Sequence, residues 1–286
     1  MSSLRDIKKR IANVGTTQQM VKAMYMIAST KLHKARAQLE GVRPIYQELK
    51  RVVRELGRQK KARSHIFYQG REVQNSLYIV LTSDRGFSGS YSASILAKAL
   101  EHMDEGKNEK ILVVGSKGHH FFKKRGKNIV RTITNLPDAQ VYYGSESIGN
   151  WAIDLYLSGE VDEVFVVYTR FETVLNYEPC VDRLLPVDTG GIEIDDDYDH
   201  IKYEPDVTRF IDNVIPFFMH MSLFRAFSES HTSEEAARMV NMDTAGKNAE
   251  EMIRDLTRMY NRRRQAAITQ EISEIVGSAS MLNIEE

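Results

Sequence analysis

The chain has 286 residues, enough for one large domain or two small ones. Its 39 basic and 39 acidic side chains give a formal charge of zero, which excludes the overall basic excess of a general nucleic-acid binder. A single cysteine, Cys180, excludes an internal disulfide, and no apolar run of about 18 residues predicts a membrane-spanning helix. The first residues, MSSLRDIKKRI, lack the apolar segment of a secretory signal, so we expect a cytoplasmic protein.

Residues 1–60 have the apolar spacing of a coiled-coil helix. Apolar side chains follow alternating steps of four and three residues at Ala28, Leu32, Ala35, Leu39, Val42, Tyr46, Leu49, Val53 and Leu56. A similar stripe, Leu4, Ile7, Ile11 and Val14, precedes them. We expect the Gly15–Thr17 segment to loosen this helix and Pro44 to bend it, because proline removes a backbone donor.

Residues 70–200 change to short runs of β-branched and aromatic residues, which are typical of strands. These runs are 76–84, 110–116, 128–134 and 163–171, and the segments 92–103, 117–126 and 147–159 between them have helical patterns. Strands that alternate with helices predict an α/β domain with a largely parallel sheet. This domain ends in the acidic loop GGIEIDDDYDH.

Residues 206–286 return to helical spacing, and we expect Pro216 to mark a break or the first turn of the main helix. Two stripes follow: Ala249, Ile253, Leu256 and Tyr260 in mid-helix, then Ile268, Ile272, Ile275, Ala279 and Leu282 near the end. Because the two terminal helices match in length and stripe, each is the natural partner of the other. The predicted fold class is therefore α/β, an antiparallel coiled coil of the N- and C-terminal helices with a central Rossmann-like α/β domain.

Several segments resemble ligand sites without completing one. The stretch SDRGFSGSYSAS follows a strand and opens a helix, where phosphates bind, but it lacks both glycine-rich phosphate motifs, and a tight turn with a helix cap explains it better. His119 and His120 are adjacent and diverge on a helix, and His200 stands where a calcium loop around Asp195, Asp197 and Asp199 would need glycine. Cys180 has no neighbouring base. We therefore expect no catalytic residue, no metal and no cofactor.

Two further clusters allow two interpretations each. Arg262, Arg263 and Arg264 could form a nucleic-acid patch, but successive helical residues fan around the axis and suit contacts with several surrounding surfaces. Met20, Met24 and Met26 also lie on different helix faces. They either fill a core or make soft contacts with a moving partner.

The two ends of the chain carry a specific resemblance. LRDIKKRIANVGTTQQMVKAMYMIASTKL and YNRRRQAAITQEISEIV resemble the gamma subunit of F-type ATP synthases, and SDRGFSG, VVGSKG, LLPV, YEPD and SEEAARMV extend the match along the chain. The resemblance implies a rotor shaft inside a hexamer of alpha and beta subunits, with its α/β domain bound to the epsilon subunit and the c-ring. It implies no nucleic-acid partner, and contact with the membrane only through the complex, at the cytoplasmic face of a bacterial cell membrane.

By motif match, the resemblance also assigns contact residues. The expected contacts with the beta subunit are Lys22, Met24, Arg238, Arg264, Gln265, Thr269 and Glu271, and those with epsilon or the c-ring are Tyr203 and Glu204. Ion-driven rotation of the asymmetric shaft would bias the three catalytic sites toward different conformations, while the chain itself catalyses nothing. Two alternatives stay open from the residues alone: a coiled-coil adaptor with an α/β cargo domain, and a small nucleotide-binding enzyme.

Overall fold

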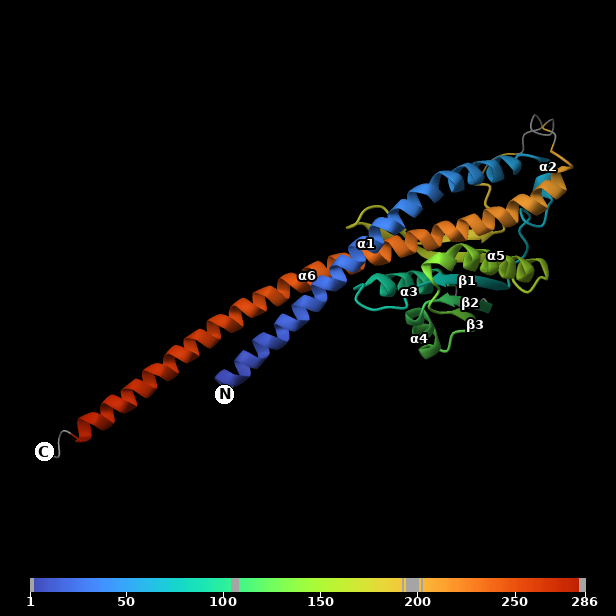
Figure 1. Ribbon diagram of the computed structural model, residues 1–286. Helices are drawn as coiled ribbons and strands as arrows, with labels where there is room; N and C mark the ends of the chain where they lie inside the picture. The colour runs from blue at the N-terminus through green and yellow to red at the C-terminus, as the bar shows by residue number, and fades with distance from the viewer. Residues whose placement is uncertain (1–2, 104–107, 192, 194–200, 202, 283–286) are drawn as a thin grey trace. The chain divides into compact units, whose positions relative to one another are not determined.

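A computed structural model describes residues 3–103, 108–191, 193, 201 and 203–282, without the side chains of residues 277–282. The chain divides into two compact units, one formed by Met1–Ile27 with Met239–Glu286 and the other by Ala28–Arg238. Helices α1 (Leu4–Leu56) and α6 (Val207–Leu282) each contribute to both units (Figure 1). Between them, the described residues form five strands, the helices α2 (Lys60–Arg63), α3 (Tyr91–His102), α4 (Ser116–Lys124) and α5 (Val141–Leu157), and the short 3-10 helix η1 (Asp138–Gln140).

Local polar groups cap the starts of the two long helices, and both helices then run on without a break. Ser3 and Asp6 cap α1 reciprocally, since each backbone N–H donates to the other side chain, at 2.9 and 3.2 Å. The helix is continuous through Gly15–Thr17, so the expected loosening does not interrupt it. At the start of α6, the Asp206 carboxylate accepts the Arg209 N–H at 2.9 Å. Pro216 lies inside α6, so the prediction that it marks the break or first turn was wrong.

The first unit pairs the amino-terminal part of α1 with the carboxyl-terminal part of α6 in antiparallel fashion. Val21 lies beside Gly246, whereas Arg10 lines one groove with Leu256 and Met259. The predicted stripes are at the interface, because Ile7, Ala249 and Leu256 are buried. The stripe near the end of α6 does not lie at this interface, since Ile268, Ile272 and Ile275 are 45%, 55% and 66% exposed. Packing of these three side chains against the partner helix was a wrong prediction, and Ala279 and Leu282 lie outside the described side chains.

The second unit is built on a five-stranded sheet of order β3-β2-β1-β4-β5. Strands β1 (Asn75–Leu81), β2 (Asn108–Val114), β3 (Ile129–Ile133) and β4 (Glu163–Phe171) are parallel and match the four predicted runs. The edge strand β5 (Tyr177–Leu185) is antiparallel to β4 and was not predicted. The predicted α/β domain with a mainly parallel sheet is therefore confirmed.

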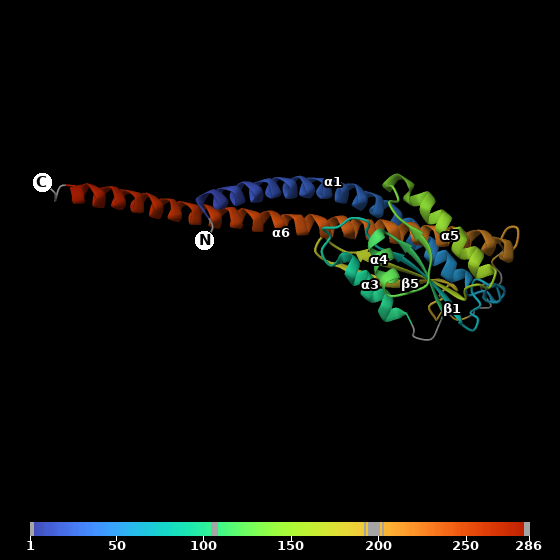
Figure 2. The same cartoon turned by 90° about the horizontal axis from the view of Figure 1, so that it is seen from below.

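Alternate residues along β1 face two separate cores, because successive side chains of a strand point to opposite faces. Leu77, Ile79 and Leu81 pack with α5 and with the parts of α1 and α6 that belong to this unit. Tyr78 and Val80 pack with α3 and α4 on the other face, and the two views agree on this layering (Figures 1 and 2). The heptad stripe of residues 28–56 is largely buried in this unit, with Ala28, Val53 and Leu56 fully covered.

Candidate functional site

The carboxyl edge of the sheet is the usual ligand-binding position in doubly wound α/β folds. In doubly wound folds, ligands bind where the strand order reverses, which here is between β1 and β4. In this chain α6 covers that position: Tyr91, at the start of α3, donates to the Ser230 carbonyl at 2.9 Å, and Arg238 donates to the Gly86 carbonyl at 3.4 Å. The switch point is therefore occupied by the protein's own helix.

The two glycine-containing motifs at this edge have structural roles. The Asp84 carboxylate accepts the Ser116 N–H at the start of α4 and the Asn135 N–H, both at 2.8 Å. It thus occupies the helix terminus where a phosphate would bind. Gly115 has a φ of 96°, and a Cβ there would lie 2.3 Å from the Thr82 carbonyl oxygen, so this turn requires glycine.

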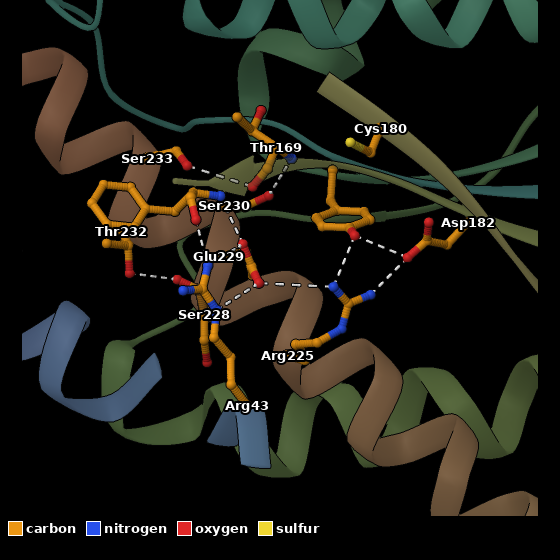
Figure 3. Close-up of polar contacts among 12 residues, drawn as sticks. Arg43, Thr169, Cys180, Asp182, Arg225, Ser228, Glu229, Ser230, Thr232 and Ser233 are labelled. Carbon is orange, nitrogen blue, oxygen red and sulfur yellow. Dashed lines mark hydrogen bonds and ion pairs between the residues drawn. The ribbon is translucent and has the colours of Figure 1, made fainter. Parts of the chain in front are cut away.

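A buried polar network joins α6 to β4, β5 and α1 (Figure 3). Arg225 pairs with Asp182 at 2.7 Å and donates to the Tyr168 hydroxyl at 2.8 Å. Burial opposes the charge of Arg225, but Tyr168, Tyr46 and Asp182 together raise its pKa above the usual value. Arg225 therefore stays charged inside the protein, where only its partners make the charge tolerable.

One turn further along α6, the Glu229 carboxylate meets three groups. Both of its oxygens accept N–H bonds from Arg43 of α1 at 3.1 Å, and it accepts the Phe171 N–H of β4 at 2.7 Å. Arg225 lies 3.8 Å away. Glu229 is 3% exposed, so these bonds form away from water, where they are stronger than on a surface.

A cavity of about 320 Å³ lies beside this edge, lined by α6, β1, β2 and the segment around η1. Its lining mixes cations such as Lys31 and Arg85 with the carboxylates of Asp138, Glu234 and Glu235. Burial raises the pKa of Glu234, while Arg238 opposes that rise through an ion pair with it. Asp138, Glu234 and Glu235 are thus each ion-paired with a cation of the chain.

The remaining candidate reactive groups have ordinary partners. The His120 ring meets the Ser116 carbonyl at 2.6 Å and His119 meets the Thr132 hydroxyl at 3.0 Å, so the two rings do not converge on one point. Partial burial raises the pKa of the Cys180 thiol, which disfavours the reactive thiolate. Within the described ranges, no three His, Cys, Asp or Glu side chains are placed to hold a metal. Asp195, Asp197, Asp199 and His200 lie outside those ranges.

The contact residues predicted in the first unit occupy two separate places. Lys22 and Met24 are exposed on α1 close to the level of Gly246 of α6. Arg264, Gln265, Thr269 and Glu271 are exposed on α6, beginning about 27 Å further along that helix at 1.5 Å per residue. The Thr269 hydroxyl donates to the Gln265 carbonyl at 2.9 Å, which leaves the Gln265 amide outside this bond.

The predicted residues of the second unit differ in their exposure. Arg238 is only 9% exposed and pairs with Glu234 and with Glu235. Tyr203 is half-buried, with its ring 4.9 Å from that of Phe210, while Glu204 beside it is exposed. Tyr203 and Glu204 thus share one surface position, whereas Arg238 belongs to a buried cluster.

Sequence reasoning missed the network around Glu229 and Arg225. Arg43 and Glu229 are 186 positions apart, so no local pattern connects them. It also missed several strongly exposed side chains, including Phe87, Tyr143 and Leu175 at 64%, 70% and 82% exposure. These side chains lie in connecting segments or at a helix start, where hydrophobic periodicity carries no signal.

Comparison with known proteins identifies the family. A family model described as ATP synthase matches residues 3–282. The ATP synthase gamma chain of Desulforamulus reducens is 38% identical over 282 residues, which cover 99% of this chain and 100% of that one. The chain belongs to the ATP synthase gamma chain family. Another gamma chain, from Alkaliphilus metalliredigens, is also 38% identical and covers 98% of both chains.

Solved structures support the gamma-chain fold. A chain of the Euglena gracilis mitochondrial ATP synthase, in a structure of OSCP, F1 and c-ring, matches with a TM-score of 0.69 at 19% identity. The match covers 98% of this chain and 94% of that one. A chain of the Tetrahymena thermophila central stalk and c-ring matches with a TM-score of 0.61 at 21% identity, over 79% and 99% of the two chains. In the described part of the chain, no helix is both long and apolar enough to span a membrane.

Proposed function

We propose that this gamma chain is the central rotor shaft of an F-type ATP synthase. It couples ion-driven rotation of the c-ring to conformational changes in the catalytic beta subunits during ATP synthesis or hydrolysis. The observation that carries the proposal is the exposed apolar end of α6, with Ile268, Ile272 and Val276 at 45%, 55% and 58% exposure. An apolar surface of this kind marks an interaction site, and a shaft enclosed by a ring of subunits requires one.

The proposed partners are the alpha and beta subunits of the catalytic hexamer, the epsilon subunit and the c-ring. The matching structures support these partners, since one is of a central stalk with its c-ring and the other is of OSCP, F1 and c-ring. We assign segments 1–60 and 206–286 to the shaft and 70–200 to the α/β domain at its foot. In this arrangement the protein is peripheral, at the cytoplasmic face of a bacterial cell membrane, and reaches the membrane through the complex.

In this proposal Lys22, Met24, Arg264, Gln265, Thr269 and Glu271 contact the beta subunit, and Tyr203 with Glu204 contacts epsilon or the c-ring. The exposure of all but Tyr203, which is half-buried, supports these roles. Arg238 would act differently, because its guanidinium is held by Glu234 and Glu235. It would support the surface around it and reach beta only with its exposed part.

The chain itself would catalyse nothing. Three observations on the second unit support this: α6 covers the switch point, Asp84 fills the terminus of α4, and the thiol of Cys180 has a raised pKa. Its contribution would be differential contact, because each orientation of an asymmetric shaft presents different side chains to each beta subunit. Rotation would thereby bias the three catalytic sites toward different conformations.

The double variant Arg264→Ala/Gln265→Ala tests the beta contact. Both side chains are exposed, so we expect a stability change of less than about 0.5 kcal/mol in the isolated chain. If they form charge-assisted and amide bonds with a beta-subunit loop, turnover of the complex falls several-fold while its subunit composition stays normal. Arg258→Ala, at an 80% exposed side chain of the same helix, is the matched control. Unchanged ATP hydrolysis and synthesis in the double variant would refute the assignment.

A further inference from the structure

Strand β4 extends beyond the end of its pairing with β1. The ladder between them ends at Val80 and Val167, yet β4 continues to Phe171. Strand β5 pairs with the other edge of β4 as far as Phe171, but the backbone groups on the β1 side beyond Val167 need other partners, because buried N–H and C=O groups are costly when left without hydrogen bonds. Thr169 and Phe171 are both buried, at 2% and 4% exposure.

Side chains of α6 and α1 supply those partners, in place of a neighbouring strand (Figure 3). The Thr169 N–H donates to the Ser230 hydroxyl at 3.1 Å, and its carbonyl accepts from the Ser233 hydroxyl at 3.5 Å. The Phe171 N–H donates to Glu229 at 2.7 Å, and its carbonyl accepts from Arg43. Two alternate residues of β4 thus bond to side chains through both backbone groups, as strand residues usually bond to the next strand.

This side-chain ladder, defined by Thr169 and Phe171 with Arg43, Glu229, Ser230 and Ser233, differs in kind from the apolar packing around it. Apolar contacts are non-directional, so they hold two elements together without fixing how one slides along the other. The bonds from Arg43 to both oxygens of Glu229 have a defined geometry. The ladder therefore fixes the register of α6 and α1 against the sheet.

We propose that this side-chain ladder is the mechanical link that carries torque between the α/β domain and the two long helices. The inference rests on the proposed rotor function. Glu229 is the central positioning residue, because its single carboxylate bonds α1 and β4 and faces Arg225 of its own helix. A rotor that keeps its fold but loses this register slips under load, and hydrolysis then proceeds with less ion transport per ATP.

The test uses the complete complex in lipid vesicles and measures ions pumped per ATP hydrolysed, with proton and sodium uptake both recorded. Glu229→Gln keeps the size and an acceptor for the Phe171 N–H but removes the charge that Arg43 and Arg225 face. We expect the ion-to-ATP ratio to fall about twofold or more, with near-normal hydrolysis and subunit composition. Glu48→Gln, which removes the same charge from a 70% exposed side chain paired with Arg51, should keep the wild-type ratio.

Two further variants test other bonds of the side-chain ladder. Ser230→Ala removes only the acceptor of the Thr169 N–H. If the Glu229→Gln complex does not assemble, the ion-to-ATP ratio of Ser230→Ala tests the inference in its place. Arg43→Gln/Glu229→Gln should be no worse than the poorer single variant, because both changes break one link. Wild-type ratios in Glu229→Gln and Ser230→Ala would overturn the inference. A wild-type complex that pumps no ions during ATP hydrolysis would instead overturn the proposed rotor function.

Discussion

Two alanine substitutions on α6 separate the paired part of the first unit from the exposed end of the helix. Leu256→Ala and Ile272→Ala each remove three carbon atoms, but Leu256 is 8% exposed and Ile272 is 55% exposed. At about 0.8 kcal/mol per buried carbon, the loss is roughly 2 kcal/mol at Leu256 and about 1 kcal/mol at Ile272. Alanine also has the higher helix propensity, by about 0.4 kcal/mol over isoleucine, so the net cost at Ile272 is close to 0.5 kcal/mol.

Amide hydrogen exchange of the isolated chain measures this difference locally. We expect Leu256→Ala to lower the opening free energy of residues 4–27 and 239–263 by about 2 kcal/mol, whereas Ile272→Ala leaves these amides nearly unchanged. The order should reverse in the assembled complex, where Ile272 is proposed to face partner subunits. If Ile272→Ala destabilises the isolated chain as much as Leu256→Ala, the end of α6 is an interhelical seam, and our interpretation of its exposure is wrong.

Two other predictions concern the second unit. Burial alone would raise the pKa of Asp162, but the Asn75 and Gln74 N–H groups and Arg71 together lower it from 3.8, so its stabilising contribution is present above that pH and is lost as pH falls below it. Urea unfolding at a series of pH values should show a shallower loss of stability on acidification in Asp162→Asn than in the wild type, and equal slopes would contradict the assignment. Calorimetry should detect no ATP binding to the isolated chain at micromolar concentrations, because α6 and Asp84 occupy the positions a phosphate would need; a stoichiometric binding isotherm would refute that.

The long-range regularities of the fold were readable from the sequence. Most of the stripe from Ala28 to Leu56 is buried, as the heptad spacing predicts, while Tyr46 and Leu49 are half-buried. Strand β5 escaped prediction because Pro179 and the charged residues Asp182 and Arg183 obscure its pattern, which suits an edge strand. The end of α6 was misassigned for another reason: periodicity identifies an apolar face but not the molecule that covers it.

Some residues of the candidate sites could be predicted from the sequence, and others could not. The exposure of Lys22 and Gln265 agrees with a contact role, although the resemblance to a family, and not residue chemistry, pointed to them. The burial of Arg238 between Glu234 and Glu235 could not be anticipated, since a helical arginine with nearby acids is usually a solvated surface group. The bonds of Glu229 join three elements that are far apart in sequence, and only the folded chain brings them together.

Side chains of the chain itself bond the backbone groups at the carboxyl edge of this Rossmann-like domain, where α6 meets the sheet. In such folds the carboxyl edge offers unpaired backbone groups and a helix terminus, and a nucleotide usually satisfies them. Here Ser230 and Glu229 bond the N–H groups of β4, and Asp84 bonds that of Ser116. The same backbone chemistry that would hold a phosphate reversibly holds a helix permanently. A ligand site exchanges its occupant, whereas a shaft must keep its attachment through every turn, so bonding this edge to α6 is what the proposed mechanical role requires.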